Sequence, residues 1–252
     1  MSDALLIERA DDRVVAHLNR PHARNAINRE IIDALHALCS EVEAEPRILI
    51  LAGVGGTFAS GADIAELRDR RAADAHAGIN SNAFIRIHEL PMPVIAAIDG
   101  YALGGGAELA YAADFRIGTP ALKIGNPETS LGIIAAAGAT WRLRELVGEP
   151  LAKDMLLAGR ILNAEEALAA SLVTEVHPAE SLITAAHALA DRIAANDPLA
   201  TRYTKRVLHA TRAEHPQVDQ EAQAMLFESP EKVRRMAAFL ERKAKHAGGV
   251  TS

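Results

Sequence analysis

Short apolar strands that alternate with helical segments restrict the fold of this chain more than any other feature. Residues 47–52 and 94–98 are almost wholly apolar, and segments with helical spacing of apolar residues precede them at about 28–43 and 73–90. A strand that is apolar on both faces has to be covered on both faces, and intervening helices supply that cover. The sequence therefore predicts an α/β layered core.

The same order of elements extends in both directions along the chain. Residues 4–9 and 13–18 flank Asp11-Asp12 and predict an opening hairpin. A third cycle follows, with a helix that starts at the glycines 104–106 and a strand over 114–118. From about Leu143 the pattern is almost purely helical, with one short strand near 173–176. The predicted helices cover roughly 149–158, 163–170, 179–195, 199–212, 216–227 and 230–246. We predict a core over residues 1–197 and a helical region over 198–252.

Composition excludes several classes of function. The 252 residues are 49% hydrophobic with a formal net charge of −6, so no basic field is available to bind nucleic acid. No apolar stretch approaches the ~20 residues of a membrane span, and the N-terminus lacks the features of a signal peptide. We therefore expect a cytoplasmic protein without nucleic-acid or membrane partners. The single cysteine, Cys39, lies on a predicted apolar helix face and is assigned to the core.

Three consecutive glycines, 104–106, join the end of a predicted strand to a helix. Bare backbone N–H groups at such a helix start favour negative charge, which suits a phosphate or a developing oxyanion. The alternative is a close helix–strand crossing that only glycine permits. Residues 57–64 place small side chains at a second helix start, and there Asp63 is interpreted as a helix cap.

Two glutamates occupy unusual positions. Glu108 lies at a helix start otherwise made of Gly, Ala, Leu and Tyr, and Glu128 follows twenty residues later in Asn126-Pro127-Glu128. A carboxylate in apolar surroundings costs stability, so a glutamate at such a position indicates a function. The alternative for each is a solvated first-turn glutamate that is stabilised by the helix dipole.

These segments together resemble the enoyl-CoA hydratase/isomerase (crotonase) family. The resemblance rests on Gly61-Ala62-Asp63-Ile64, on residues 99–110, on Asn126-Pro127-Glu128 and on Leu131-Gly132, and it continues through 157–160 and 164–167. It implies a crotonase-like spiral of ββα turns with a C-terminal helical trimerisation region. It also implies an acyl-CoA thioester substrate and a homotrimer or a dimer of trimers.

The resemblance further implies roles for single residues. The backbone N–H groups of Ala62 and Gly105 would form the oxyanion hole, and Glu108 and Glu128 would be the catalytic pair. Glu108 would mainly activate water, and Glu128 would supply the proton to C2. The substrate and CoA contacts would come from Arg24, Ala26, Asp63, Ile64, Gly104 and Ala136. Neither a metal nor another cofactor is expected, because the ten histidines lack the spacing of a metal site.

The chain departs from the family after the second glutamate. Many hydratases carry Pro-Gly-x-Gly-Gly there, whereas this chain has Ala135-Ala136-Ala137-Gly138-Ala139. Alanine keeps the N–H, but it fits poorly where a family glycine has positive φ. Hydration of a 2-enoyl-CoA is the leading hypothesis. The alternatives are double-bond isomerisation, for which one glutamate suffices, and a crotonase-fold protein that binds acyl-CoA without turnover.

Overall fold

The computed structural model describes residues 3–248, which form two compact units, one ending at Ile193 and one starting at Ala194. The predicted regions also include residues 1, 2 and 249–252, which lie outside the described range. In the first unit, β1 (Leu5–Arg9) and β2 (Arg13–Leu18) form the predicted antiparallel hairpin. The sheet continues in parallel from β2 through β3 (Ile48–Gly53), β4 (Val94–Ile98), β6 (Phe115–Gly118) and β9 (Glu175–Val176).

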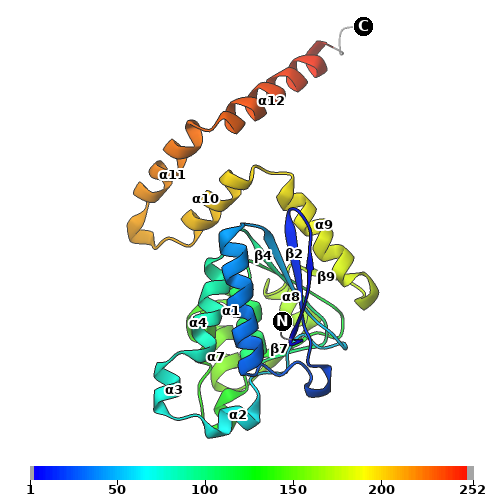
Figure 1. Ribbon diagram of the computed structural model, residues 1–252, viewed down its shortest axis with the longest axis vertical. Helices are drawn as coiled ribbons and strands as arrows, with labels where there is room; N and C mark the ends of the chain where they lie inside the picture. The colour runs from blue at the N-terminus through cyan, green and yellow to red at the C-terminus, as the bar shows by residue number, and fades with distance from the viewer. Residues whose placement is uncertain (1–2, 249–252) are drawn as a thin grey trace. The chain divides into compact units, whose positions relative to one another are not determined.

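Helices cover this six-stranded sheet, as the apolar strands require. α1 (Arg29–Ala44) begins after Asn28, whose side chain accepts a hydrogen bond from the Ile31 N–H. α1 packs against α4 (Ile79–Glu89), and the two helices lie side by side in Figure 1. The apolar face of α1 is buried and includes Cys39, so the assignment of this cysteine to the core is confirmed.

A second, smaller sheet consists of β5 (Tyr101–Leu103), β7 (Lys123–Gly125) and β8 (Ile161–Asn163). The chain passes from β4 to β5 and then into α5 (Gly105–Ala112), and similarly from β6 to β7 and then into the short helix η2 (Glu128–Leu131). Each turn of the chain thus places one strand in each sheet before a helix begins. None of these three strands was predicted from the sequence, because three residues are too few for a periodic pattern.

The helix predicted over 73–90 is interrupted. The structure has α2 (Ile64–Asp69), α3 (Ala72–His76) and then α4, and Gly78 precedes α4 with a φ of 62°. Gly78 is the N-cap of α4, and its left-handed backbone separates the two helical segments. The later helices of this unit are α6 (Ala139–Val147), α7 (Glu149–Leu157), α8 (Ala164–Ala169) and α9 (Leu182–Ala194). The predicted ranges agree with α7, α8 and α9, but none of them covers α6, which was missed.

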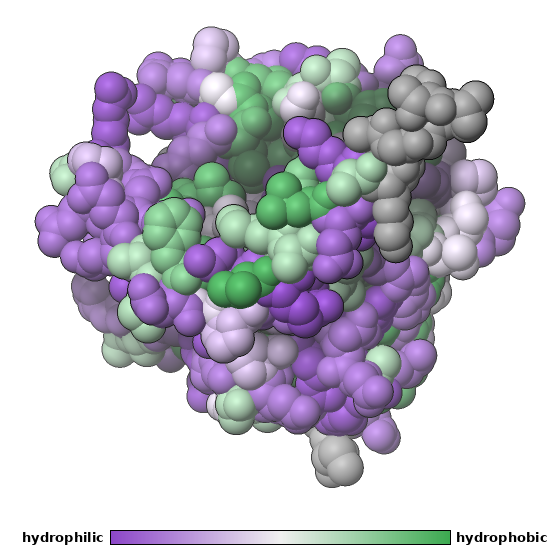
Figure 2. Space-filling view, turned by 90° about the horizontal axis from the view of Figure 1, so that it is seen from above, coloured by the Kyte–Doolittle hydropathy of each residue, from purple (hydrophilic) through white to green (hydrophobic). Residues whose placement is uncertain are grey.

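The second unit consists of helices, with α10 (Pro198–Leu208) packed against α11 (Gln217–Phe227) and followed by α12 (Pro230–Gly248). Its exposed surface carries many large apolar side chains. These exposed side chains include Leu208, Met225, Phe227, Val233, Met236, Phe239 and Leu240. Figure 2 shows one face of the whole molecule, on which hydrophobic patches lie within a hydrophilic surface. In the described part of the chain, no helix is both long enough and apolar enough to span a membrane.

One close contact fixes where α5 starts. A Cβ atom at Gly106 would lie 2.3 Å from the carbonyl oxygen of Ala59, so only glycine allows this approach. The segment around Ala59 also pairs with β5 through a parallel bridge between Ala59 and Ala102. The first turn of α5 is therefore held against the segment that leads to Ala62. Both interpretations of the triple glycine apply: Gly106 permits a close crossing, and Gly105 stands at a bare helix start.

Candidate active site

Two backbone N–H groups meet where residues 61–62 approach the start of α5. A Cβ atom on Gly105 would lie 3.4 Å from the backbone nitrogen of Ala62, so the two residues are neighbours. Gly105 is the first residue of α5, where an N–H has no intrahelical acceptor. Among the described residues, no backbone carbonyl accepts the N–H of Ala62. These two donors can therefore share one oxygen atom of a ligand.

Glu108 lies one turn further along α5 and is 4% exposed. Its Oε1 accepts hydrogen bonds from the backbone N–H groups of Ala137 at 2.7 Å and Ala139 at 3.2 Å. Burial raises the pKa of Glu108 to about 7, although the Ala139 hydrogen bond opposes the shift. The negative charge of Glu128 raises this pKa further, so the two carboxylates influence each other. Glu108 is thus a buried acid–base group and not a solvated first-turn glutamate.

Glu128 is 9% exposed and is held by a chain of buried polar side chains. The Tyr111 hydroxyl lies 3.0 Å from Asn126 Oδ1, and Asn126 Nδ2 donates to Glu128 Oε1 at 3.3 Å. The second oxygen, Oε2, is buried and has no hydrogen-bond partner in the described part of the chain. Burial raises the pKa of Glu128, which favours its protonated form. No role for Asn126 or Tyr111 was predicted from the sequence. The available signal was the position of Tyr111, three residues after Glu108 on the same helix α5.

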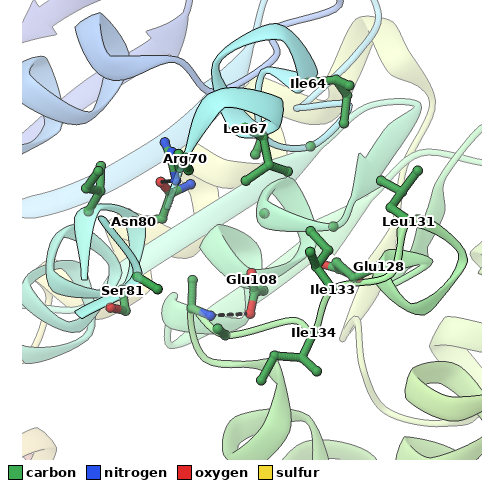
Figure 3. Close-up of a pocket in the computed structure, with 18 of the residues that line it drawn as sticks. Ile64, Leu67, Arg70, Asn80, Ser81, Glu108, Glu128, Leu131, Ile133 and Ile134 are labelled. Atoms are coloured by element: carbon green, nitrogen blue, oxygen red, sulfur yellow. Dashed lines mark hydrogen bonds between the residues drawn. The ribbon is translucent and has the colours of Figure 1, made fainter. Parts of the chain in front are cut away.

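A single pocket of about 610 Å³ brings most of the predicted site residues together. Figure 3 shows Glu108 and Glu128 facing this pocket, with Ile64 and Leu67 from α2 on one wall and Leu131, Ile133 and Ile134 on another. The predicted residues that line it are Ala62, Ile64, Gly104, Gly105, Glu108, Glu128 and Ala136. Gly104 has a φ of 51°, and a Cβ there would lie 3.2 Å from Glu128 Oε1. Glycine at this position keeps the floor of the pocket open beside the carboxylate.

Three predicted contact residues lie outside the lining of this pocket. Arg24 is exposed, with its carbonyl oxygen accepting from the N–H of Ser60, which does line the pocket. Ala26 is half-buried, and its carbonyl oxygen accepts from the Arg20 guanidinium. Asp63 caps α2 by accepting from the Ala65 N–H and forms an ion pair with Arg20 at 3.1 Å. The structure therefore gives Asp63 the cap role that the sequence indicated.

The loop over 135–139 adopts a path that suits alanine. In the described part of the chain the non-glycine residues with positive φ are Arg24, Asn25 and Ser171, so Ala136 has an ordinary backbone conformation. Ala136 is exposed and lines the pocket, whereas the neighbouring Ala137 and Ala139 donate to Glu108. Gly138 keeps a φ of 141°. The departure from the family glycines thus leaves no backbone strain at Ala136.

Comparison with known proteins identifies the class. A family model described as enoyl-CoA hydratase/isomerase matches residues 12–248. The fold also resembles solved structures of enoyl-CoA hydratases. One, from Bacillus anthracis, has a TM-score of 0.89 with 32% identity and covers 95% of this chain and 96% of its own. A putative enoyl-CoA hydratase from Streptomyces coelicolor has a TM-score of 0.90 with 31% identity, covering 96% and 93%. The predicted crotonase-like α/β spiral is therefore confirmed.

Curated relatives agree with this result. A probable enoyl-CoA hydratase of Mycobacterium bovis is 35% identical over 249 residues, or 96% of each chain. A crotonyl-CoA hydratase of Syntrophomonas wolfei is 34% identical over 250 residues, or 95% of each chain. This chain belongs to the enoyl-CoA hydratase/isomerase family. In the described residues, no group of three His, Cys, Asp or Glu side chains is arranged to hold a metal ion.

The conformation of Ala136 generates a stability prediction. Replacing Ala136 by glycine should lower the free energy of unfolding by roughly 0.5–1 kcal/mol, because glycine gains freedom in the unfolded chain and relieves no strain here. The matched reverse change in the same loop is Gly132→Ala, where φ is 74° and a Cβ would meet nothing within 4 Å. That variant should lose about 1 kcal/mol through backbone strain alone. Urea unfolding of both variants measures this, and a more stable Ala136→Gly would show that position 136 is strained.

The raised pKa of Glu108 generates a prediction about pH. Its folded-state pKa of about 7 exceeds the ordinary value of 4.5, so its contribution to stability is greatest below pH 4.5 and is lost as the pH rises through 7. Glu108→Gln cannot ionise, and glutamine can still accept from both loop N–H groups. Relative to that of the wild type, the free energy of unfolding of the variant should rise by up to about 3 kcal/mol between pH 4.5 and pH 8. Chemical unfolding at the two pH values tests this prediction. If the variant and the wild type differed in free energy of unfolding by the same amount at both, Glu108 would not have the raised pKa of a buried carboxyl group.

Proposed function

We propose that this chain is an enoyl-CoA hydratase that adds water across the C2=C3 double bond of a 2-enoyl-CoA thioester. The observation that supports this most directly is the pair of buried carboxylates, Glu108 and Glu128, in one pocket beside two backbone N–H donors. An isomerase requires only one proton-shuttling carboxylate. The two relatives named above are themselves described as hydratases.

The backbone donors act on the thioester. Its carbonyl oxygen accepts from the N–H groups of Ala62 and Gly105, which are adjacent in the structure. Negative charge develops on this oxygen when water attacks C3, and preoriented N–H groups stabilise such charge because they need no reorganisation. Removing one donor of this kind costs roughly 3 kcal/mol of transition-state stabilisation in other enzymes.

The carboxylates act on water. Ionised Glu108 accepts a proton from the water whose oxygen bonds to C3, and protonated Glu128 donates a proton to C2. The π electrons of the C2=C3 bond pass through the thioester enolate to form the new C2–H bond, so atoms and charges balance. The raised pKa of both groups supports this exchange of protons near neutral pH. The loop N–H groups of Ala137 and Ala139 hold Glu108 in place for the attack.

The remainder of the substrate is coenzyme A, and no separate cofactor takes part in this proposal. Arg24 is an exposed cation whose backbone bonds to Ser60 at the pocket, which supports a contact with the CoA phosphates. Ala26 precedes Ile27, which pairs with Ala62 and thereby borders the oxyanion hole. We place the enzyme in the cytoplasm, with no membrane or nucleic-acid partner. Its core spans residues 1–197, and residues 198–252 assemble it into a trimer or a dimer of trimers.

Substitution of the two glutamates tests the reaction. Glu108→Gln and Glu128→Gln should each lower kcat for hydration by about 100-fold or more with little change in CoA-ester binding, because each removes one proton transfer. If the two share one water, the double variant should be little worse than either single variant. The loss of enoyl-thioester absorbance reports hydration. Additive losses would contradict a shared water, and formation of a shifted double bond without water uptake would indicate an isomerase.

The exposed apolar face of the second unit predicts assembly. Val233, Met236, Phe239 and Leu240 lie on one face of α12, are all exposed, and form the type of surface that oligomers bury. Light scattering at micromolar concentration should give a multiple of the 26.8 kDa chain mass. Phe239→Arg should reduce that mass, whereas Glu241→Arg, on another face of α12, should not. A monomeric wild type would contradict this assembly.

A further inference from the structure

One side of the pocket is polar although most of its wall is apolar. Ile64, Leu67, Leu131, Ile133 and Ile134 supply the apolar surface. Arg70, from the end of α2, and Asn80, from the first turn of α4, lie next to each other on the opposite side from Leu131 (Figure 3). A hydrocarbon chain would gain nothing from these polar groups and would strip water from them at a cost.

The contact between these two side chains fixes the orientation of the Asn80 amide. Arg70 Nη1 donates to Asn80 Oδ1 at 3.0 Å. A guanidinium has donors only, so the amide oxygen has to face Arg70 and the amide nitrogen has to face away from it. That nitrogen lies 3.7 Å from the position of a Cβ on Gly105, beside the donors of the oxyanion hole. The NH₂ group of Asn80 is therefore turned away from Arg70, on the side of Gly105.

Arg70 differs from its neighbours in its charge partners. Arg20 pairs with Asp63 at 3.1 Å, and Arg68 pairs with Asp69 at 3.0 Å. Within the described residues the half-buried guanidinium of Arg70 has the Asn80 amide as its hydrogen-bond partner and forms no ion pair. A guanidinium has several donors in a planar fork that matches a carboxylate. Its remaining donors are available to an anionic ligand.

Two further charged residues of the pocket lining, Arg71 and Asp74, follow Arg70 closely in the chain. Asp74 Oδ2 accepts from the backbone N–H of Arg71, and Arg71 Nη1 donates to the carbonyl oxygens of Arg68 and Arg70. Arg70, Arg71 and Asp74 together carry one net positive charge, and the other charged residues of the lining are the two glutamates, Glu108 and Glu128. The net positive charge of the first three residues favours an anionic group on the acyl chain over an uncharged one.

We propose that Arg70 and Asn80 form a subsite for a carboxylate at the far end of the acyl group. This inference rests on the proposed hydratase function. The substrate is then the CoA monothioester of an unsaturated dicarboxylic acid. The thioester carbonyl lies at Ala62 and Gly105, the double bond lies between the two glutamates, and the distal carboxylate accepts from the Arg70 guanidinium and the Asn80 amide. The apolar wall holds the methylene groups between them.

The test compares two thioesters of equal chain length, the CoA monothioester of 2-hexenedioic acid and 2-hexenoyl-CoA. The purified full-length protein should hydrate the carboxylated thioester with a kcat/KM roughly tenfold or more above that of the neutral one, since charge-assisted hydrogen bonds discriminate on this scale. Arg70→Met should abolish or reverse this ratio. Arg68→Met removes the same charge from the same helix outside the pocket, and it should leave the ratio and both rates unchanged.

Other outcomes distinguish the possible failures. Hydration of both thioesters with an equal or lower kcat/KM for the carboxylated one would overturn the subsite and leave the hydratase intact. Unchanged activity of Arg70→Met on both thioesters would also overturn the subsite. An equal rise of KM for both thioesters in that variant would show that Arg70 contacts the CoA moiety instead. A wild type that hydrates neither thioester, nor shorter or longer 2-enoyl-CoA esters, would refute the proposed function itself.

Discussion

The close packing of α5 against the backbone at Ala59 is the constraint on which the site depends. Gly106 allows an approach that even one methyl group would prevent, since a Cβ there would lie 2.3 Å from the Ala59 oxygen. This approach sets the N–H of Gly105 beside that of Ala62. It also directs Glu108, two residues after Gly106, into the same pocket. The two proposed oxyanion donors and the first carboxylate are thus positioned by a single backbone contact.

Glu108 in turn organises the loop that closes the other side of the pocket. Its carboxylate accepts two backbone hydrogen bonds from Ala137 and Ala139, so the loop is attached to α5 through the group that performs the proposed chemistry. Burial raises the pKa of Glu108 to about 7, while the two N–H donors limit the rise. The balance keeps the group able to gain and lose a proton near neutral pH. Burial of this carboxyl group costs stability above pH 7, and the proposed acid–base role of Glu108 accounts for its retention.

Glu128 depends on a different support, because its helix η2 has only four residues and cannot fix a side chain alone. The buried chain from Tyr111 through Asn126 to Glu128 orients one carboxylate oxygen and leaves the other free for a proton. Tyr111 belongs to α5, as Glu108 does. The positions of both carboxylates therefore depend on α5. This shared support maintains their relative placement, although the surrounding loops differ from those of many relatives.

The sequence by itself determined the family and the alternating α/β core, and it singled out the candidate oxyanion residues and the glutamate pair. The core follows from the spacing of apolar residues, and the two glutamates stand out because a carboxylate is costly at such positions. The family, and the roles of the oxyanion residues and of the glutamate pair, follow from the resemblance of the motifs to the enoyl-CoA hydratase/isomerase family. It did not determine β5, β7, β8 or the break at Gly78, since three-residue strands and a single left-handed residue leave no periodic signal. The conformation of Ala136 and the pairing of Arg70 with Asn80 were decided only by the tertiary structure. The first depends on the path of a loop that Glu108 holds through two backbone hydrogen bonds, and the second joins side chains at the end of α2 and the start of α4. Neither backbone path nor side-chain pairing follows from composition.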